Sequence, residues 1–220
     1  MTARSVRASL RCFLLWPALA VAGGLPPLPG GLEPEAAHGR VRMTEGGLEI
    51  AADKGTDLFV DPAGTQAADT APRALFLPQG DFVFSARVAP RFGGGAYEGG
   101  ALLAYAGPAC WGKLLFERFA SGRNGVATTT ARGAGGDDAY HGTRDADAQY
   151  LKIARRGGTY VFYTSHDGTD WNFVRSFALP CDGPVRIGFA AQAPLSTGFA
   201  ADFGDVRYRA ATIRDYWQGE

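Results

Sequence analysis

Apolar and polar residues alternate with a period of two along most of the chain, the pattern of β-strands that bury one face. In residues 82–88, for example, Phe82, Phe84, Ala86 and Val88 share one side. Turn signals separate such runs at the spacing of about 8–12 residues that is typical of all-β sandwiches and barrels. Only Thr212–Gln218 is expected to form a single turn of helix. The predicted strands are 48–52, 58–60, 82–89, 99–105, 112–119, 126–132, 150–156, 159–164, 171–177, 185–192 and 200–208.

Two tight turns join predicted strands into antiparallel hairpins. Gly157 and Gly158 separate the strand that ends at Arg156 from the next one, as in a two-residue hairpin loop. Asp167-Gly168 suits a positive φ and precedes the strand that begins at Trp171. The sequence therefore predicts a run of antiparallel hairpins.

Composition supports a folded, glycine-rich β protein with no polyanionic partner. Of 220 residues, 46% are hydrophobic and 20% are charged, which is typical of one globular domain. The 31 glycines and 13 prolines lie below the low-complexity range, so the glycines are expected in turns and bulges. Since 22 basic side chains balance 22 acidic ones, nucleic acids and anionic membranes are poor candidates as partners.

The amino terminus has the pattern of a secretory signal peptide. Arg4, Arg7 and Arg11 precede an apolar run from Cys12 to Ala22 that ends in Ala20-Val21-Ala22, so residues 1–22 are expected to be removed. The alternative is a start-site extension that is not part of the native protein. The run is too short to span a hydrocarbon core of about 30 Å, so no membrane anchor is expected. The protein is then secreted or periplasmic if the segment is cleaved, and cytoplasmic otherwise.

Cleavage would leave a slightly acidic chain with two cysteines. Residues 23–220 carry 19 basic and 22 acidic side chains, a formal charge of −3. Export permits a disulfide between Cys110 and Cys181, but their positions do not establish one, and two small buried hydrophobic residues are the slightly favoured interpretation. The predicted organisation is an extended lead-in with a first strand (23–47), a sandwich (48–209) and a carboxyl-terminal tail (210–220).

Several segments, in their order along the chain, carry a family resemblance. They are residues 48–59, 80–88, 111–117, the Ser165-x-Asp167-Gly168 turn with Trp171, and residues 186–189. Together they resemble the bacterial and fungal family of unknown function named for "regulation of enolase", a branch of the concanavalin A-like lectin/glucanase superfamily, over about residues 28–209. The resemblance implies a jelly roll of two antiparallel sheets with one concave face, and it implies no established activity.

Catalytic patterns are weak. A glucanase of this fold needs two carboxylates about 5–5.5 Å apart, which on one strand requires acids at i and i+2 or i+4. The strand from Trp111 carries one acid, Glu117, so a hydrolase or lyase using Glu117 is only an alternative. His38, His141 and His166 are scattered, and no Gly-x-Ser-x-Gly motif occurs. Catalysis is therefore not the favoured hypothesis.

No metal or cofactor motif is present, and none is expected to bind. The stretch around residues 133–147 is predicted to be a loop, and four of its acids are conceivable calcium ligands. Solvated loop charges are the favoured interpretation. These acids are Asp137, Asp138, Asp145 and Asp147.

A polar face is the best candidate for function. Alternation places Trp111, Lys113 and Glu117 on one side of their strand, with Leu114 and Phe116 in the core. If the neighbouring strands join the same sheet, as the resemblance implies, further polar residues converge on the concave face. The predicted ligand-binding set is Trp111, Lys113, Glu117, Thr130, Arg132 and Gln192, with Asp57 beside them. The alternatives are a solvated face with weak ion pairs and, for Asp57, a turn cap.

These observations favour a non-catalytic β-sandwich that binds a carbohydrate or similar polyhydroxylated ligand on its concave face. The second hypothesis is an intracellular regulatory module that binds a protein partner, as the family name suggests. The two differ in whether residues 1–22 are cleaved. Whether the segment Gly133–Arg144 plugs the face or leaves it open is a question for the structure.

Overall fold

The computed structural model describes residues 24–220, so the predicted signal peptide at 1–22 lies outside the described residues. Within that range the chain forms strands and turns, and no helix is long and apolar enough to cross a membrane. The strands are β1 Glu33–Glu35, β2 Gly39–Thr44, β3 Gly47–Asp53, β4 Leu58–Val60, β5 Ala67–Asp69, β6 Arg73–Phe76, β7 Phe82–Pro90, β8 Gly99–Tyr105, β9 Cys110–Arg118, β10 Asn124–Arg132, β11 Gly135–Thr143, β12 Gln149–Arg156, β13 Thr159–Ser165, β14 Trp171–Ala178, β15 Arg186–Gln192 and β16 Gly198–Arg209.

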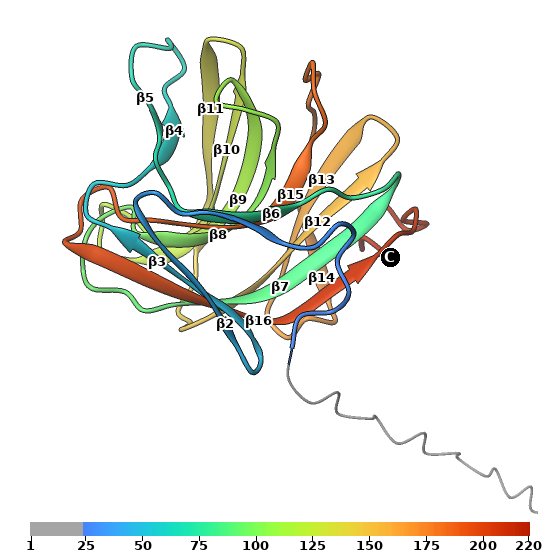
Figure 1. The fold of residues 1–220 in the computed structure, drawn as a ribbon, viewed down its shortest axis with the longest axis horizontal. Helices are drawn as coiled ribbons and strands as arrows, with labels where there is room; N and C mark the ends of the chain where they lie inside the picture. Colours follow the sequence, from blue (N-terminus) through green and yellow to red (C-terminus); the bar gives the residue numbers. More distant parts are fainter. Residues whose placement is uncertain (1–23) are drawn as a thin grey trace, which may run out of the picture.

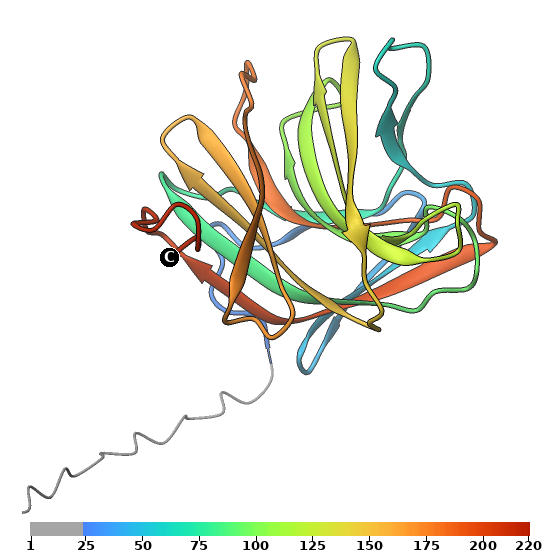
Figure 2. The same ribbon diagram turned by 180° about the vertical axis from the view of Figure 1, so that it is seen from behind.

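Two large antiparallel sheets pack face to face (Figure 1), which confirms the predicted all-β sandwich. The first sheet has the order β1-β6-β15-β8-β9-β10-β11, and the second has the order β14-β13-β12-β7-β16-β3-β2. The strands of the predicted polar face, β9, β10 and β15, all belong to the first sheet. The short β4–β5 hairpin stands beside β9–β11, as the views from both sides show (Figures 1 and 2).

The core lies between the sheets and follows the predicted alternation. Phe84 of β7 meets Phe189 of β15 edge to face, with ring centroids 5.2 Å apart, so one aromatic pair bridges the two layers. The apolar faces of 82–88, 151–153 and 187–189 are all buried there. Such aromatic pairs contribute roughly 0.5–1.5 kcal/mol beyond the area that they bury.

Both hairpin turns form as predicted. Arg156 pairs with Thr159 across the two glycines. The Ser165 hydroxyl accepts a hydrogen bond from the Gly168 amide at 2.9 Å, and Gly168 has a φ of 77°. A glycine is favoured at such a φ because it has no Cβ.

Two local predictions are wrong. Residues 135–143 form the edge strand β11 instead of a loop. Residues 212–218 form no helix, because the Asp215 side chain accepts hydrogen bonds from the Trp217 and Gln218 amides and closes a turn instead. The lead-in 23–47, for which one first strand was expected, contains two, β1 and β2. Strands β5 and β6, of three and four residues, were absent from the sequence prediction.

A disulfide joins Cys110 at the start of β9 to Cys181 after β14, with a Cα–Cα distance of 5.8 Å. The two half-buried cysteines are therefore bonded, and not the pair of reduced hydrophobic residues slightly favoured from the sequence. The bond links the first sheet to a loop of the second.

Candidate functional site

A cavity of about 340 Å³ lies on the outer face of the first sheet, between the β9–β11 end and the β4–β5 hairpin. This is the face on which alternation along β9 places Lys113 and Glu117. Polar groups and aromatic rings both line the cavity. The lining residues are Asp57, Phe59, Gln66, Tyr97, Lys113, Leu115, Glu117, Thr129, Asp138, Tyr140, Gln192, Pro194 and Leu195.

Lys113 organises the floor of the cavity. Its side chain is 3% exposed, and its ammonium donates hydrogen bonds to the Leu58 carbonyl at 2.6 Å and to Gln192 Oε1 at 2.8 Å. Leu58 begins β4, so this contact ties the hairpin to the sheet. Gln192 in turn donates from Nε2 to the Tyr97 carbonyl at 2.9 Å. The buried charge is thus held by a connected set of hydrogen bonds, as buried cations require.

The β4–β5 hairpin is fixed at two further points. The Asp69 carboxylate accepts hydrogen bonds from Tyr105 Oη at 2.6 Å and from Arg73 at 2.5 Å. The Gly136 amide of β11 donates to the Asp61 carbonyl at 3.2 Å. The wall of the cavity is therefore anchored on β6, β8 and β11, in addition to the Lys113 contact from β9.

Glu117 reaches the cavity from β9 with its side chain almost fully buried, the residue being 4% exposed. Its register partners are Gly99 on β8 and Gly125 on β10, so neither neighbouring strand places a side chain against it. A Cβ at Gly99 would lie 2.7 Å from the Glu117 Cβ, closer than packed atoms allow. Residue 99 must therefore lack a Cβ for β8 to lie this close to Glu117.

Burial raises the pKa of the Glu117 carboxyl to about 8, and the nearby Asp138 and Asp57 carboxylates add to the increase, while Lys113 opposes it. Glu117 accepts or donates no side-chain hydrogen bond among residues 24–220. At neutral pH it is therefore mostly protonated and has free hydrogen-bonding capacity.

Two further carboxyls flank Glu117 from other elements. Asp57 lies before β4, and its Oδ1 accepts a hydrogen bond from the Leu58 amide at 2.8 Å. Burial raises the pKa of Asp57, although Lys113 lowers it. Asp138 of β11 accepts a hydrogen bond from the Thr129 hydroxyl at 2.6 Å. Asp57 thus combines the two roles considered from the sequence, since it fixes its turn and also lines the cavity.

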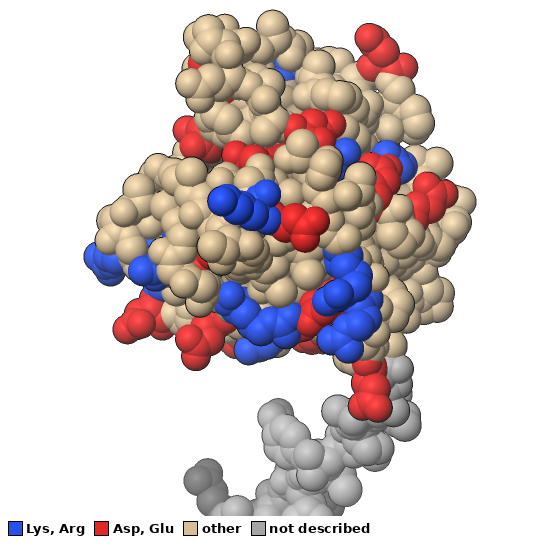
Figure 3. Space-filling model, turned by 60° about the vertical axis from the view of Figure 1, so that its left-hand side comes forward, with Lys and Arg blue, Asp and Glu red and all other residues tan. Residues whose placement is uncertain are grey.

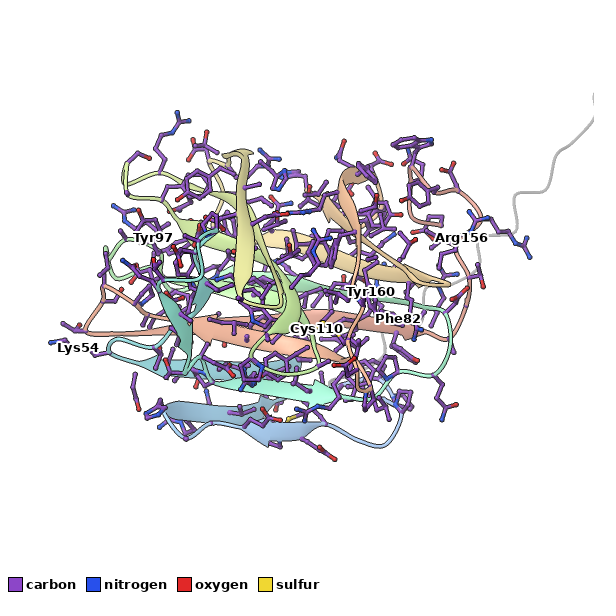
Figure 4. The ribbon with its side chains drawn as sticks, turned by 90° about the horizontal axis from the view of Figure 1, so that it is seen from above. Lys54, Phe82, Tyr97, Cys110, Arg156 and Tyr160 are labelled. Atoms are coloured by element: carbon purple, nitrogen blue, oxygen red, sulfur yellow. A yellow bond between two sulfur atoms is a disulfide. The ribbon has the colours of Figure 1, made fainter. Side chains whose placement is uncertain are left out.

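Aromatic side chains form the upper walls. Tyr140 is 55% exposed and stacks on Phe119 with ring centroids 4.5 Å apart. Tyr97 has a φ of 65°, which is unusual for a residue with a side chain. Figure 4 shows Tyr97 on the side of the molecule away from Arg156. A backbone held in this region costs on the order of 1–3 kcal/mol, and such residues cluster at active sites and ligand-binding loops.

Four of the seven predicted site residues line the cavity: Asp57, Lys113, Glu117 and Gln192. Trp111 shares their face but is 1% exposed and packs in the apolar cluster below the cavity, with its Nε1 donating to the Pro108 carbonyl at 3.0 Å. Trp111 therefore offers no open ring to a ligand.

Thr130 and Arg132 face the other side of the sheet. In the β9–β10 register Lys113 pairs with Thr129, while Thr130 pairs with Gly112 and Arg132 with Cys110. Their assignment to the polar face is therefore wrong by one residue, and a one-residue slip moves every side chain of a strand to the opposite face. Arg132 lies 3.5 Å from Asp137, and Thr129 takes the position predicted for Thr130.

Sequence reasoning missed the aromatic walls and Asp138. Asp138 and Tyr140 are two residues apart, so they share a face only if residues 135–143 form a strand. The polar character of this stretch had indicated a loop. The segment Gly133–Arg144 forms one wall of the cavity, so it does not plug the face.

The acids considered for calcium do not gather. Asp137 forms an ion pair with Arg175 at 2.7 Å, and Asp138 bonds to Thr129. Across residues 24–220 no group of three or more His, Cys, Asp or Glu side chains has the arrangement of a metal site.

The charged surface is mixed in sign. Figure 3 shows basic and acidic side chains interleaved over one face of the molecule. The buried Glu49, for example, pairs with Arg42 at 3.2 Å and also with Arg91.

The chain matches a known family whose function is not established. The family model described as "Protein of unknown function (DUF1349)" matches residues 33–211. The description does not contain the regulation-of-enolase name. No curated protein matches the chain.

Solved structures with the same fold include a functionally unknown protein from Saccharomyces cerevisiae. It has a TM-score of 0.73 at 16% identity, over 82% of this chain and 96% of that one. The carbohydrate-binding module CBM66 from Bacillus subtilis gives a TM-score of 0.54 at 13% identity, over 84% and 99%. The GH43 BlXynB protein from Bacillus licheniformis gives 0.60 at 14% identity, over 74% of this chain but only 33% of its own length.

Proposed function

We propose that this chain, which belongs to the DUF1349 family of proteins of unknown function, binds a carbohydrate or similar polyhydroxylated ligand in its cavity. The proposed function is binding without catalysis. The observation that carries the proposal is the combination of buried polar groups with open aromatic rings in one cavity. Carboxyls, an amide and a hydroxyl bond to sugar hydroxyls, while rings such as Tyr140 stack on their apolar faces.

The cavity is built on rigid elements. Lys113, Glu117, Thr129 and Gln192 project from adjacent strands of one sheet, so their spacing is fixed before a ligand arrives. Such preorganisation lowers the entropic cost of binding. A fold shared with a carbohydrate-binding module gives further support.

A glycan array probed with the labelled protein, followed by calorimetric titration of the retained glycans, tests the proposal. We expect selective binding that the Asp138→Asn variant weakens, because Asp138 stands at the rim of the cavity beside Thr129. Arg132→Ala is the matched control, since Arg132 faces the other side of the sheet. Absence of binding to every glycan would contradict the proposal.

A second candidate function is slow cleavage of a glycan, by hydrolysis or by the elimination reaction of a lyase, with Glu117 as general acid. It is favoured by the burial of the Glu117 carboxyl in the cavity, which raises its pKa to about 8 and keeps the acid protonated at neutral pH. Incubation of bound glycans with wild type and Glu117→Gln, with products separated by chromatography, distinguishes the two. Cleavage by the wild type that is lost in Glu117→Gln would support this second function and contradict the proposal of non-catalytic binding.

We also propose that the protein is exported. The disulfide between Cys110 and Cys181 supports an oxidising compartment, as does the signal-peptide pattern of residues 1–22. The alternative, an intracellular regulatory module of the regulation-of-enolase type, requires that residues 1–22 remain. Amino-terminal sequencing of the protein from its native host decides between them: a chain that starts at Gly23 supports export.

A further inference from the structure

The cavity contains more negative than positive groups. Among its lining residues Asp57, Glu117 and Asp138 carry carboxyls, and Lys113 is the one cation, all within the described residues 24–220. If all four were ionised, the cavity would hold a net charge of −2. Three carboxyls that line one small cavity repel one another, which is a reason that the Glu117 proton is retained.

The Lys113 ammonium uses most of its hydrogen-bonding capacity within the protein. Two of its three donors are used on the Leu58 carbonyl and Gln192 Oε1, and the residue is 3% exposed. Its charge stabilises the hairpin and the floor, and Glu117 is not among its hydrogen-bond partners at these distances. The carboxyls at the cavity surface therefore lack a cation that faces the ligand.

Glu117 and the aromatic walls complete a site suited to a positive group. The Glu117 carboxyl is buried, opens into the cavity and has no hydrogen-bond partner among residues 24–220. Tyr97, Tyr140 and Phe59 line the same cavity, and aromatic faces attract cations. A cavity with a carboxylate at its floor and aromatic walls recognises an ammonium group better than it recognises a neutral hydroxyl.

We infer that the ligand of this cavity carries a protonated amine, as an amino sugar with a free amino group does. This inference rests on the proposed carbohydrate binding and names the substrate class. Neutral and N-acetylated sugars lack the charge, and uronic acids would place a fourth carboxyl among the three already present.

Binding would change the protonation of Glu117. Below its pKa of about 8 the free protein holds the proton. An ammonium group beside the carboxyl favours the ionised form, so the proton passes to the buffer and an ion pair is left in the cavity. The charged and titratable groups that face Glu117 are Lys113 on its own strand, Asp57, Asp138, Tyr97 and Tyr140. A neutral ligand supplies no charge, so it would leave the proton in place.

Calorimetric titration at a pH below the pKa of the sugar amine, with fully deacetylated chito-oligosaccharide and with its N-acetylated counterpart of equal length, tests the inference. We expect the amine form to bind at least about tenfold more tightly at physiological salt, with release of up to one proton. Titration in two buffers of different protonation enthalpy measures that release.

Two variants complete the test. Glu117→Gln keeps the shape of the side chain, so it is expected to remove the preference for the amine and the proton release. Glu45→Gln makes the same change in an exposed turn and serves as the control. An unchanged amine preference in Glu117→Gln would overturn the inference.

The possible failures are distinguishable. If neutral glycans bind as tightly as the amine, the inference is wrong and carbohydrate binding stands. If no glycan of either kind binds, both the inference and the proposed function are wrong. Equal loss of amine binding in Glu45→Gln would mean that the oligosaccharide is attracted by overall charge, which also overturns the inference.

Discussion

Replacing Glu117 by glutamine tests the electrostatics of the cavity while keeping its shape. The two side chains have the same size, but glutamine does not ionise. Glu117 is 4% exposed and sits between Gly99 and Gly125 of the neighbouring strands, so the substitution introduces no new contact. Any difference in stability that depends on pH therefore reports the ionisation of this one carboxyl.

The sign and size of the effect follow from the pKa. Folding raises the pKa of Glu117 from its ordinary value of 4.5 to about 8, mainly through burial. Between these values the unfolded chain holds fewer protons than the folded one, so the stability of the wild type falls as pH rises and levels off above about 8. Each pH unit contributes about 1.4 kcal/mol, which gives a ceiling of roughly 5 kcal/mol over the window.

Urea unfolding from about pH 5 to about pH 9, without reductant, measures the difference. We expect the free energy of unfolding of Glu117→Gln, relative to the wild type, to increase by several kcal/mol with rising pH and then to stay constant. Glu45→Gln should show no such slope. A relative stability of Glu117→Gln that does not change with pH would refute the buried, protonated state of Glu117.

Further substitutions address the scaffold and the face of the sheet. Lys113→Met leaves the Leu58 carbonyl and Gln192 without their donor, so we expect a loss of roughly 2–3 kcal/mol in urea unfolding; an unchanged midpoint would contradict its role as anchor. Trp111→Ala, which empties a buried site, should cost about 3–5 kcal/mol; a loss below 1 kcal/mol would show that the ring is not packed as described. Cys181→Ser removes a bond between residues 71 positions apart and should cost roughly 2–4 kcal/mol under oxidising conditions only; equal stability of variant and wild type without reductant would mean that the bond is absent.

Much of the fold was predictable because alternation identifies a buried face within each strand. The apolar sets of residues 82–88 and 187–189 both lie in the core. Alternation also placed Lys113 and Glu117 on one face of β9, and Gln192 on the same face of the sheet.

The pairing of neighbouring strands was not predictable in the same way. Each strand has two faces, and the turn that joins two strands decides which residues lie side by side. Residues 119–123 between β9 and β10 set Thr129, and not Thr130, opposite Lys113. On β10 both candidates are threonines, so no difference in polarity marks the correct face.

Edge strand β11 escaped prediction because both of its faces carry polar residues. Its outermost position leaves most of its residues at least partly exposed, so no apolar alternation is required. Asp138 and Tyr140 therefore gave no signal, although they form one wall of the cavity. The prediction for Trp111 was wrong for a different reason. Its indole lies on the expected face, but the β4–β5 hairpin and the surrounding apolar cluster cover the ring.

The position of a bound glycan in a co-crystal tests the central claim most directly. We expect electron density for a sugar in the cavity of the first sheet, within hydrogen-bond distance of Glu117 and Asp138 and against the ring of Tyr140. A sugar bound elsewhere on the protein, or an empty cavity in crystals that hold a glycan known to bind in solution, would contradict the proposed function.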